Sequence, residues 1–190
     1  MPIDTPHDVD LYALGRGVVW IATHTDGVIG TYVDVGNCTN FQLELSEERL
    51  DHYSYRTAVK QKDKLFVLES GYKINFDLDE LGVQNMVKFL KGTLTANSII
   101  RANQNVDAEW AVKFVSANAS GPNYSVECWR LKLSPNGALS LIGDEYIKLS
   151  FSGEGLADET GHASSPQFDW RWLTTTTTST TTSTTTTTAP

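Results

Sequence analysis

Most of the chain alternates between apolar and polar residues with a period of two, which predicts half-buried β-strands. The clearest case is 40–46, where three apolar residues on one parity alternate with polar ones. A longer run, 66–78, keeps aromatic and aliphatic residues on one parity, and Gly71 within it can accommodate a bend. Further strands are predicted at 14–23, 110–115, 124–133 and 146–152.

One segment, 79–91, has its apolar residues at helical spacing instead. Asp79 can cap the start of this helix, Lys88 favours the negative end of its dipole, and Gly92 can end it. One short α-helix among six to eight antiparallel strands predicts a mainly β protein. We therefore expect a β-sandwich or an open barrel that carries a single helix.

The segment 53–64 breaks the alternation, because it is polar and basic and lies between two strands. Loops of about 12 residues without structure of their own are usually functional or disordered. In an acidic protein, a basic loop suits an acidic surface on another subunit. We therefore predict an assembly loop that orders against a neighbouring subunit. Its candidate interface residues are Tyr53, Tyr55, Arg56, Lys60, Lys62 and Lys64.

The C-terminal part also departs from the strand pattern and divides the chain into three regions. A β domain is expected over 1–156, a linker rich in Gly, Ser and Asp over 157–173, and a low-complexity arm over 174–190. The C-terminal arm consists almost entirely of Thr and Ser, so it has no apolar face to bury and should be disordered on its own. The linker ends in three alternating aromatic residues that we expect to anchor the arm: Phe168, Trp170 and Trp172.

Composition and charge narrow the possible functions. Hydrophobic residues make up 40% and charged residues 20% of the 190 residues, so the chain as a whole is globular. A net charge of -8 argues against binding to nucleic-acid backbones or to anionic membranes. The sequence contains no run of 18 apolar residues, so we expect no transmembrane helix. The N-terminus lacks the features of a signal peptide.

Residue patterns for catalysis or metal binding are absent from the sequence. The four histidines have no metal-ligand spacing, and no nucleophile elbow, phosphate-binding loop or zinc-helix motif occurs. We therefore expect no catalytic residues, no metal and no cofactor, and a protein that is not an enzyme. Cys38 and Cys128 are too few for a disulfide framework and are interpreted as buried thiols.

The order of the segments resembles that of the tail tube (major tail) proteins of long-tailed, siphovirus-like bacteriophages. The resemblance covers about residues 10–155 and rests on four features. These are the glycine-rich start at 14–20, the segments 36–43 and 47–54, and the long strand that is followed by the helix ending at Gly92. It implies a β-sandwich with one helix that assembles into hexameric rings, which stack into a hollow tube for DNA ejection.

The same resemblance implies partners and a location. Besides further copies of itself, the chain would contact a tape-measure protein, a tail terminator and tail-tip proteins. It would be part of the virion tail, assembled in the host cytoplasm, without membrane contact. DNA would pass through the tube without specific binding. A lumen lined by carboxylates would repel DNA. Glu44, Glu109 and Glu127 are candidates, although each strand could equally turn them outward.

Two other interpretations stay open. A carbohydrate-binding β-sandwich module with a Thr-rich linker would use the five Trp and seven Tyr residues to stack on sugars. The Trp residues within predicted strands also suit core packing, however. A chaperone-like or capsid-decorating β-protein is the third interpretation.

Overall fold

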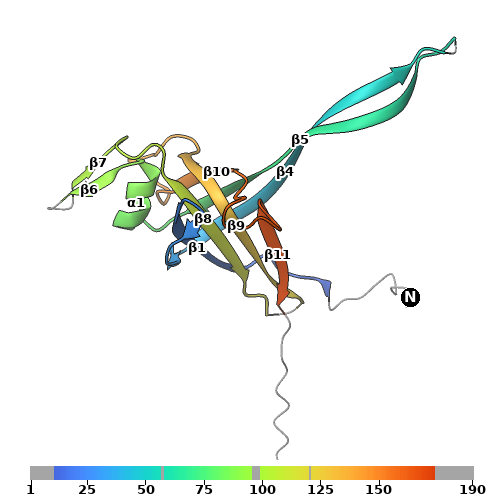
Figure 1. The fold of residues 1–190 in the computed structure, drawn as a ribbon. Coiled ribbons are helices and arrows are strands. Elements are labelled where there is room, and N and C mark those ends of the chain that lie inside the picture. Colours follow the sequence, from blue (N-terminus) through green and yellow to red (C-terminus); the bar gives the residue numbers. More distant parts are fainter. Residues whose placement is uncertain (1–10, 57, 96–98, 120, 174–190) are drawn as a thin grey trace, which may run out of the picture.

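The structure is a computed structural model that describes residues 11–56, 58–95, 99–119 and 121–173. A curved antiparallel sheet forms the body of the molecule, and a long two-stranded ribbon projects from it (Figure 1). A short helix and a small second sheet lie at the opposite side of the body from the ribbon. The predicted C-terminal arm, 174–190, lies outside the described residues.

Strands account for most of the regular structure in the described part of the chain, which also contains one short helix. In chain order the elements are β1 (Gly17–Thr25), β2 (Val28–Ile29), β3 (Val33–Asp34), β4 (Cys38–Ser54), β5 (Gln61–Leu78), α1 (Val83–Phe89), β6 (Thr93–Thr95), β7 (Ile99–Arg101), β8 (Glu109–Ser116), β9 (Asn123–Pro135), β10 (Leu149–Gly155) and β11 (Phe168–Leu173). The prediction of a mainly β protein with a short helix is confirmed.

The main sheet has nine strands, and its principal path runs β2-β1-β8-β9-β10-β5-β4. Strand β3 pairs with β1, and β11 pairs with the half of β9 that β10 leaves uncovered. Strands β6 and β7 form a separate two-stranded sheet. All these pairings are antiparallel, as expected for a sandwich or open barrel.

The sheet curls until its two ends face each other around one core. Phe41 of β4 stacks on Phe114 of β8 at 5.1 Å, although three strands separate β4 from β8 along the path. Phe76 and Phe151 stack at 4.9 Å in the centre, and Phe89 of α1 covers Phe151 edge-on at 5.6 Å. The helix thus closes one side of the core. The largest fully buried apolar side chains are Phe76, Phe151, Ile21, Ile74, Leu78, Leu131, Leu149, Val19 and Val112.

Strand β5 shows how one alternation pattern spans two environments. Its even positions from Tyr72 to Leu78 are buried in the core. Pairing with β10 begins only at Lys73, so the preceding residues of β5 have β4 as their only strand neighbour among the described strands. Phe66 and Leu68 continue the same parity but are exposed. The pattern predicted the strand correctly and could not show that half of it leaves the body.

The prediction of a loop over 53–64 is wrong in its bounds. β4 continues to Ser54 and β5 begins at Gln61, so only 55–60 remains as the turn of a long hairpin. The polar composition has a physical reason other than a loop. Neither face of this ribbon packs on the core, so polar residues are tolerated on both faces.

The predicted helix over 79–91 is shorter in the structure, and its cap differs. It spans Val83–Phe89, with Gly82 at the N-cap position. Asp79 does not cap the helix, because its carboxylate accepts hydrogen bonds from the Asn37 side-chain amide at 2.8 Å. Glu80 accepts a bond from the Asn37 backbone N–H at 3.2 Å. Both acidic residues therefore tie the segment before the helix to the start of β4.

The predicted linker over 157–173 is also corrected. Its last six residues form β11, which pairs with β9 from Phe168 opposite Cys128 to Leu173 opposite Asn123. The aromatic residues therefore belong to the main sheet of the same chain. Gly, Ser and Asp before them predicted an irregular connection but gave no sign of the strand that follows.

We expect the two environments of β5 to separate in unfolding experiments. Replacing Phe76, which is 0% exposed, with Ala should lower the free energy of unfolding by about 3–5 kcal/mol, because it leaves a cavity. Phe66→Ala, at 43% exposure on the same strand, should cost less than about 1 kcal/mol in the monomer. Urea unfolding followed by tryptophan fluorescence measures both. Equal losses would contradict the division of β5.

Candidate functional site

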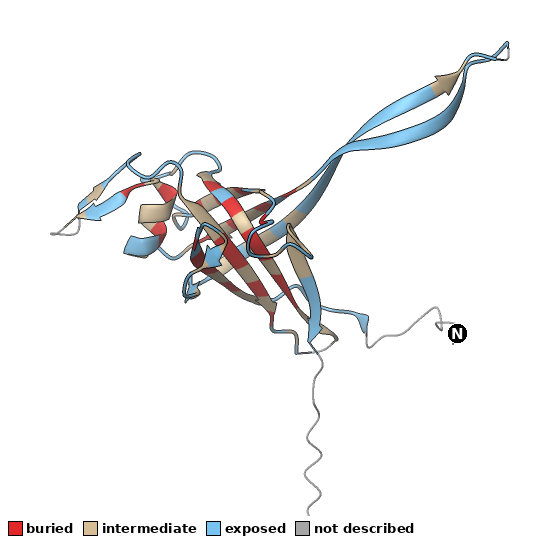
Figure 2. Ribbon diagram, in the orientation of Figure 1, coloured by how far each residue is buried: buried red, intermediate tan, exposed pale blue. Residues whose placement is uncertain are grey.

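The ribbon formed by residues 45–70, called the arm from here on, is the most unusual surface of the molecule. It extends away from the body and is exposed along nearly its whole length (Figure 2). Its β5 strand, from Gln61 to Ser70, spans about 30 Å at about 3.3 Å per residue. Within the described chain, β4 pairs only with β5, so no further strand covers either backbone edge of the arm. Free edges of this length are templates for contact with another chain.

Apolar side chains lie on both faces of the arm. Leu50 stands opposite Phe66 on one face, and Val67 stands opposite Arg49 on the other. A two-stranded hairpin is at best marginally stable by itself in water. An arm that exposes this much apolar surface is suited to packing against another molecule. Its exposed aliphatic and Phe residues are Leu45, Leu50, Val59, Leu65, Phe66, Val67 and Leu68.

Charged pairs fix the register of the arm without burying it. Lys62 contacts Asp51 at 2.5 Å, and His52 Nδ1 lies 2.6 Å from a carboxylate oxygen of Asp63. The hydrogen bond from Lys62 lowers the pKa of Asp51 below its ordinary value. Exposed ion pairs of this kind contribute little to stability. They select one pairing of the two strands over a slipped one.

The tip of the arm, residues 53–60, is aromatic and basic. The Lys60 ammonium lies 3.9 Å from the centre of the Tyr53 ring and 5.5 Å from that of Tyr55. Tyr55 is 75% exposed, and the ion pairs among the described residues do not include Arg56. These four predicted interface residues are thus brought together at the tip.

The other two predicted interface residues lie on the stem of the arm. Lys62 is engaged by Asp51, and the Lys64 ammonium sits 4.5 Å above the ring of Phe66. All six residues therefore share one hairpin, and the ion pairs among the described residues leave Arg56 and Lys60 at the tip and Lys64 on the stem without a carboxylate partner. The assembly role predicted for them stays a prediction.

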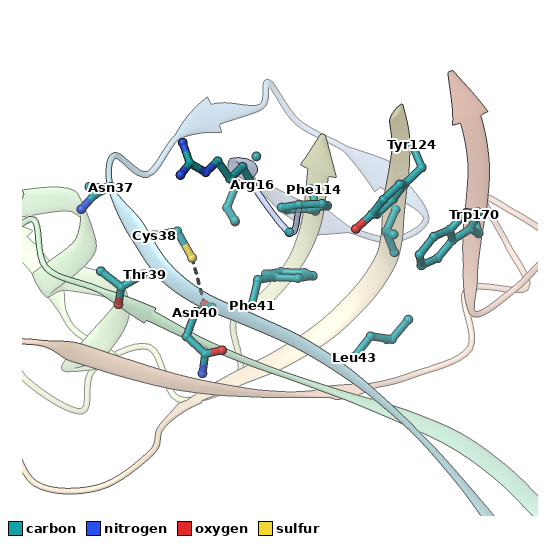
Figure 3. Close-up of a pocket in the computed structure, with 14 residues that line it drawn as sticks. Arg16, Asn37, Cys38, Thr39, Asn40, Phe41, Leu43, Phe114, Tyr124 and Trp170 are labelled. Atoms are coloured by element: carbon teal, nitrogen blue, oxygen red, sulfur yellow. Dashed lines mark hydrogen bonds between the residues drawn. The ribbon is translucent and has the colours of Figure 1, made fainter. Parts of the chain in front are cut away.

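A second candidate surface is the cavity where the two ends of the curled sheet face each other, called the seam cavity (Figure 3). It has a volume of about 640 Å³ and lies between the start of β1 and the start of β4. A row of rings crosses it: Phe41 to Phe114 at 5.1 Å, Phe114 to Tyr124 at 5.8 Å, and Tyr124 to Trp170 at 4.5 Å. Its lining also includes Arg16, Asn37, Thr39 and Asn40, so the walls combine aromatic rings with polar groups.

The three predicted anchor residues occupy one face of β11. Phe168 packs against the core and lies 5.1 Å from the Tyr72 ring. Trp170 stacks on Tyr124, and Trp172, at 62% exposure, meets Tyr124 edge-on at 6.1 Å. They therefore attach β11 to its own sheet. Whether they also hold the C-terminal arm stays a prediction, because that arm lies outside the described residues.

A buried polar cluster around His24 was missed by sequence reasoning. His24 Nδ1 lies 3.4 Å from Glu109 Oε2, and His24 Nε2 lies 3.4 Å from Asp158 Oδ2. The guanidinium of Arg130 donates two hydrogen bonds to Glu109, at 2.6 and 2.8 Å. His162 Nδ1 approaches Asp158 Oδ2 at 2.8 Å. Three of the four histidines, His24, His52 and His162, thus lie beside carboxylates.

Hydrogen bonding sets the charge states of the two carboxylates. Arg130 holds the pKa of Glu109 below its ordinary value, mainly through its hydrogen bonds. Burial acts to raise the pKa of Asp158. Bonds from His162 and from the backbone N–H of Gly161 outweigh burial and lower the pKa below its ordinary value.

The cluster ties the connection after β10 to the body. The imidazole of His162 stacks flat on Trp129 at 3.9 Å, and Asp158 makes backbone bonds to Pro166 and His162. None of these residues lines the seam cavity. The arrangement therefore acts as a structural clamp. Sequence reasoning could have found part of this cluster only through the pairing of β1 with β8. That pairing places Glu109 opposite His24.

The structure does not gather the three candidate lumen carboxylates. Glu44 is exposed and faces Lys73 across the β4–β5 ladder. Glu109 is held by Arg130, and Glu127 forms an ion pair with Lys113. Each of these carboxylates thus has a cation near it or opposite it. The lumen assignment stays a prediction.

The described residues offer little other chemistry. No group of three or more His, Cys, Asp or Glu side chains there could hold a metal ion. None of the described helices has the length and apolar character to cross a membrane. Cys38 and Cys128 are free thiols, and burial raises the pKa of Cys128 to about 12. A thiol with that pKa is a poor nucleophile at neutral pH.

The His24 cluster should make the fold acid-sensitive. The pKa values of Asp158 and Glu109 lie below their ordinary values of 3.8 and 4.5, so both contribute stability above about pH 4.5 that is lost as the pH falls through their folded values. Asp158→Asn should cost about 2–3 kcal/mol at neutral pH. It should also flatten the fall of the Tm in acid. The matched control, Glu145→Gln, should change neither the stability at neutral pH nor the fall of the Tm in acid. An unchanged acid dependence in Asp158→Asn would contradict the assignment.

Comparison with known proteins places the chain in a family. No curated protein matches the sequence. A family model described as "Protein of unknown function UCP028589" matches residues 12–106 and 94–168. These two matches cover the body, the arm and the connection to β11. The chain therefore belongs to the family described as Protein of unknown function UCP028589.

Proposed function

We propose that the protein is a structural subunit of a phage tail tube. In this proposal, copies assemble into hexameric rings, and the rings stack into a hollow tube that conducts DNA during ejection. The observation that carries the proposal is the arm, with its two free edges and its exposed apolar side chains on both faces. A surface of this kind is explained by contact with other subunits.

The geometry of the arm favours assembly over a small closed dimer. Its length of about 30 Å allows it to reach a neighbouring body. The arm and the body are different surfaces, so a contact between the arm of one copy and the body of the next is heterologous. Heterologous contacts produce rings when the rotation closes and filaments when it does not, and a tube of stacked rings contains both.

Charge is compatible with a DNA conduit. The chain carries a net charge of -8, and a ring of acidic subunits repels DNA, which can then slide without being held. The proposal places the protein in the virion tail after assembly in the host cytoplasm, without membrane contact. Tape-measure, tail terminator and tail-tip proteins are its further partners under this proposal.

A second candidate function is supported by one specific observation. Trp170 and Trp172 on β11 are both exposed and lie beside Tyr124, forming an aromatic platform at the edge of the seam cavity. Carbohydrate-binding modules use such rings to stack against sugars. This alternative leaves the arm unexplained, so we place it second.

Glycan binding distinguishes the alternative. If the protein is a carbohydrate-binding module, it should stay monomeric and be retained on an insoluble glycan, and Trp170→Ala with Trp172→Ala should lower retention at least about tenfold, since each stacking ring contributes about 1 kcal/mol or more. As a tail tube subunit, it should not be retained. The measurement is a pull-down on cellulose, chitin and peptidoglycan, with Trp110→Phe as the control for general effects of Trp loss.

Arm variants test the first proposal. Phe66→Ser with Leu68→Ser removes exposed apolar groups from the arm without touching the core, so the variant should fold normally and remain monomeric. The wild-type protein should form rings or hollow tubes in negative-stain electron microscopy and sediment as large particles. The matched control, Leu81→Ser with Ile99→Ser, removes similarly exposed groups from the body and should assemble.

The outcomes separate two questions. Wild-type protein that stays monomeric at high concentration would contradict the proposed function. Tubes formed by the wild type and by the arm variant alike would show that the arm is not the assembly element. Thermal melting of dilute samples confirms that each variant retains the fold.

A further inference from the structure

The connection between β9 and β10 exposes large apolar side chains in the same manner as the arm. Ile142 is 96% and Tyr146 is 90% exposed, and Leu141 is also exposed. The base of this connection is fixed, because Leu139 packs against the core and the Asn136 N–H bonds to the Ser150 carbonyl at 2.8 Å. We call residues 139–147 the acidic loop, for the charges described next.

Two carboxylates lie among these apolar groups. Asp144 and Glu145 lie between Ile142 and Tyr146, and both are exposed. Neither takes part in an ion pair or a hydrogen bond among the described residues. The acidic loop thus offers negative charge beside apolar surface. The arm tip offers positive charge, from Arg56 and Lys60, beside aromatic surface.

We infer that the arm tip of one copy docks on the acidic loop of a second copy. The inference deepens the proposed function and rests on it. Opposite charges would pair at the rim of the contact, while Tyr55 and Val59 of the tip would cover Ile142 and Tyr146. Both surfaces are exposed in the single chain, so binding requires no rearrangement of the core to expose them.

The occupant is a second copy because the arm carries its tip away from the body to which the acidic loop belongs (Figure 1). The β4–β5 ladder is continuous from Cys38 to the tip, so folding the arm back onto its own body would break strand pairing. A neighbouring copy can meet the tip without any such change.

The acidic loop is a better match for the tip than the seam cavity. The residues that line the seam cavity include Arg16 and no carboxylate, so a basic tip gains no ion pair there and meets a like charge. Apolar contact with the arm tip alone would suit the acidic loop and the seam cavity equally. Charge complementarity distinguishes them, and it favours the acidic loop.

Charge reversal tests the inference. Arg56→Glu with Lys60→Glu, and separately Asp144→Lys with Glu145→Lys, should each reduce tube formation at least about tenfold at low salt, since like charges then meet. Combining all four substitutions restores opposite charges and should recover assembly. A variant that combines the tip reversal with Glu159→Lys and Asp169→Lys has the same net charge but no complementary loop. It should not recover assembly.

Crosslinking provides a second readout. Tyr55→Cys in one preparation and Ile142→Cys in another, mixed and treated with a short bis-maleimide, should yield dimers joined at these two positions by mass spectrometry. Each preparation treated alone controls for reaction at Cys38 and Cys128. If wild-type tubes form but the four-substitution variant is not restored and no such crosslink appears, the inference is wrong and the proposed function stands. If wild-type protein never assembles, the proposed function fails and the inference fails with it.

Discussion

The pairing of β4 with β5 is the interaction on which the rest of the structure depends. One antiparallel ladder runs from the core, where Phe41 stands opposite Phe76, to the tip of the arm, where Ser54 stands opposite Gln61. Near the core the even-numbered side chains of β5 from Tyr72 to Leu78 are buried, and burial of apolar area supplies most of the favourable free energy of folding. Along the arm the same backbone bonds persist without burial. The body therefore stabilises the start of a ribbon that could not stand alone.

The consequence is a gradient of stability along a single pair of strands. Local unfolding free energies are lowest where few apolar contacts support the backbone bonds. Glu48 lies directly opposite Glu69 at the root of the arm, and like charges facing each other weaken the ladder there. A register shift follows between Glu48 and Arg49. The root is thus weaker than the core part of the ladder, which makes contact with a neighbour valuable for ordering the arm.

Sequence reasoning predicted the strands well because burial imposes alternation. The even positions of β5 between Tyr72 and Leu78 are one example, and β9 is another. It failed at 53–64, because an exposed ribbon and a loop have the same polar composition. It also missed β11, whose Trp170 and Trp172 stay exposed and whose place is set by the gap beside β9.

The candidate surfaces were predicted less evenly than the fold. The basic and aromatic character of the tip was visible in the sequence, since Tyr55, Arg56 and Lys60 are close neighbours in the chain. The His24 cluster was not visible, because Glu109 and Asp158 reach His24 only through the register of β1 with β8 and the path of the chain after β10. Long-range contacts of this kind leave no local pattern.

Free strand edges are a liability that a protein of this kind has to manage. An exposed, flat and apolar edge promotes unspecific sheet extension. The stem of the arm counters this with charged residues on both strands, including the pairs of Asp51 with Lys62 and His52 with Asp63. Charges that are already paired discourage a third strand without dictating a partner. The charges at the tip lack a carboxylate partner among the described residues, so specific recognition is concentrated at the tip, and the stem is left to contribute apolar area once the tip has set the geometry.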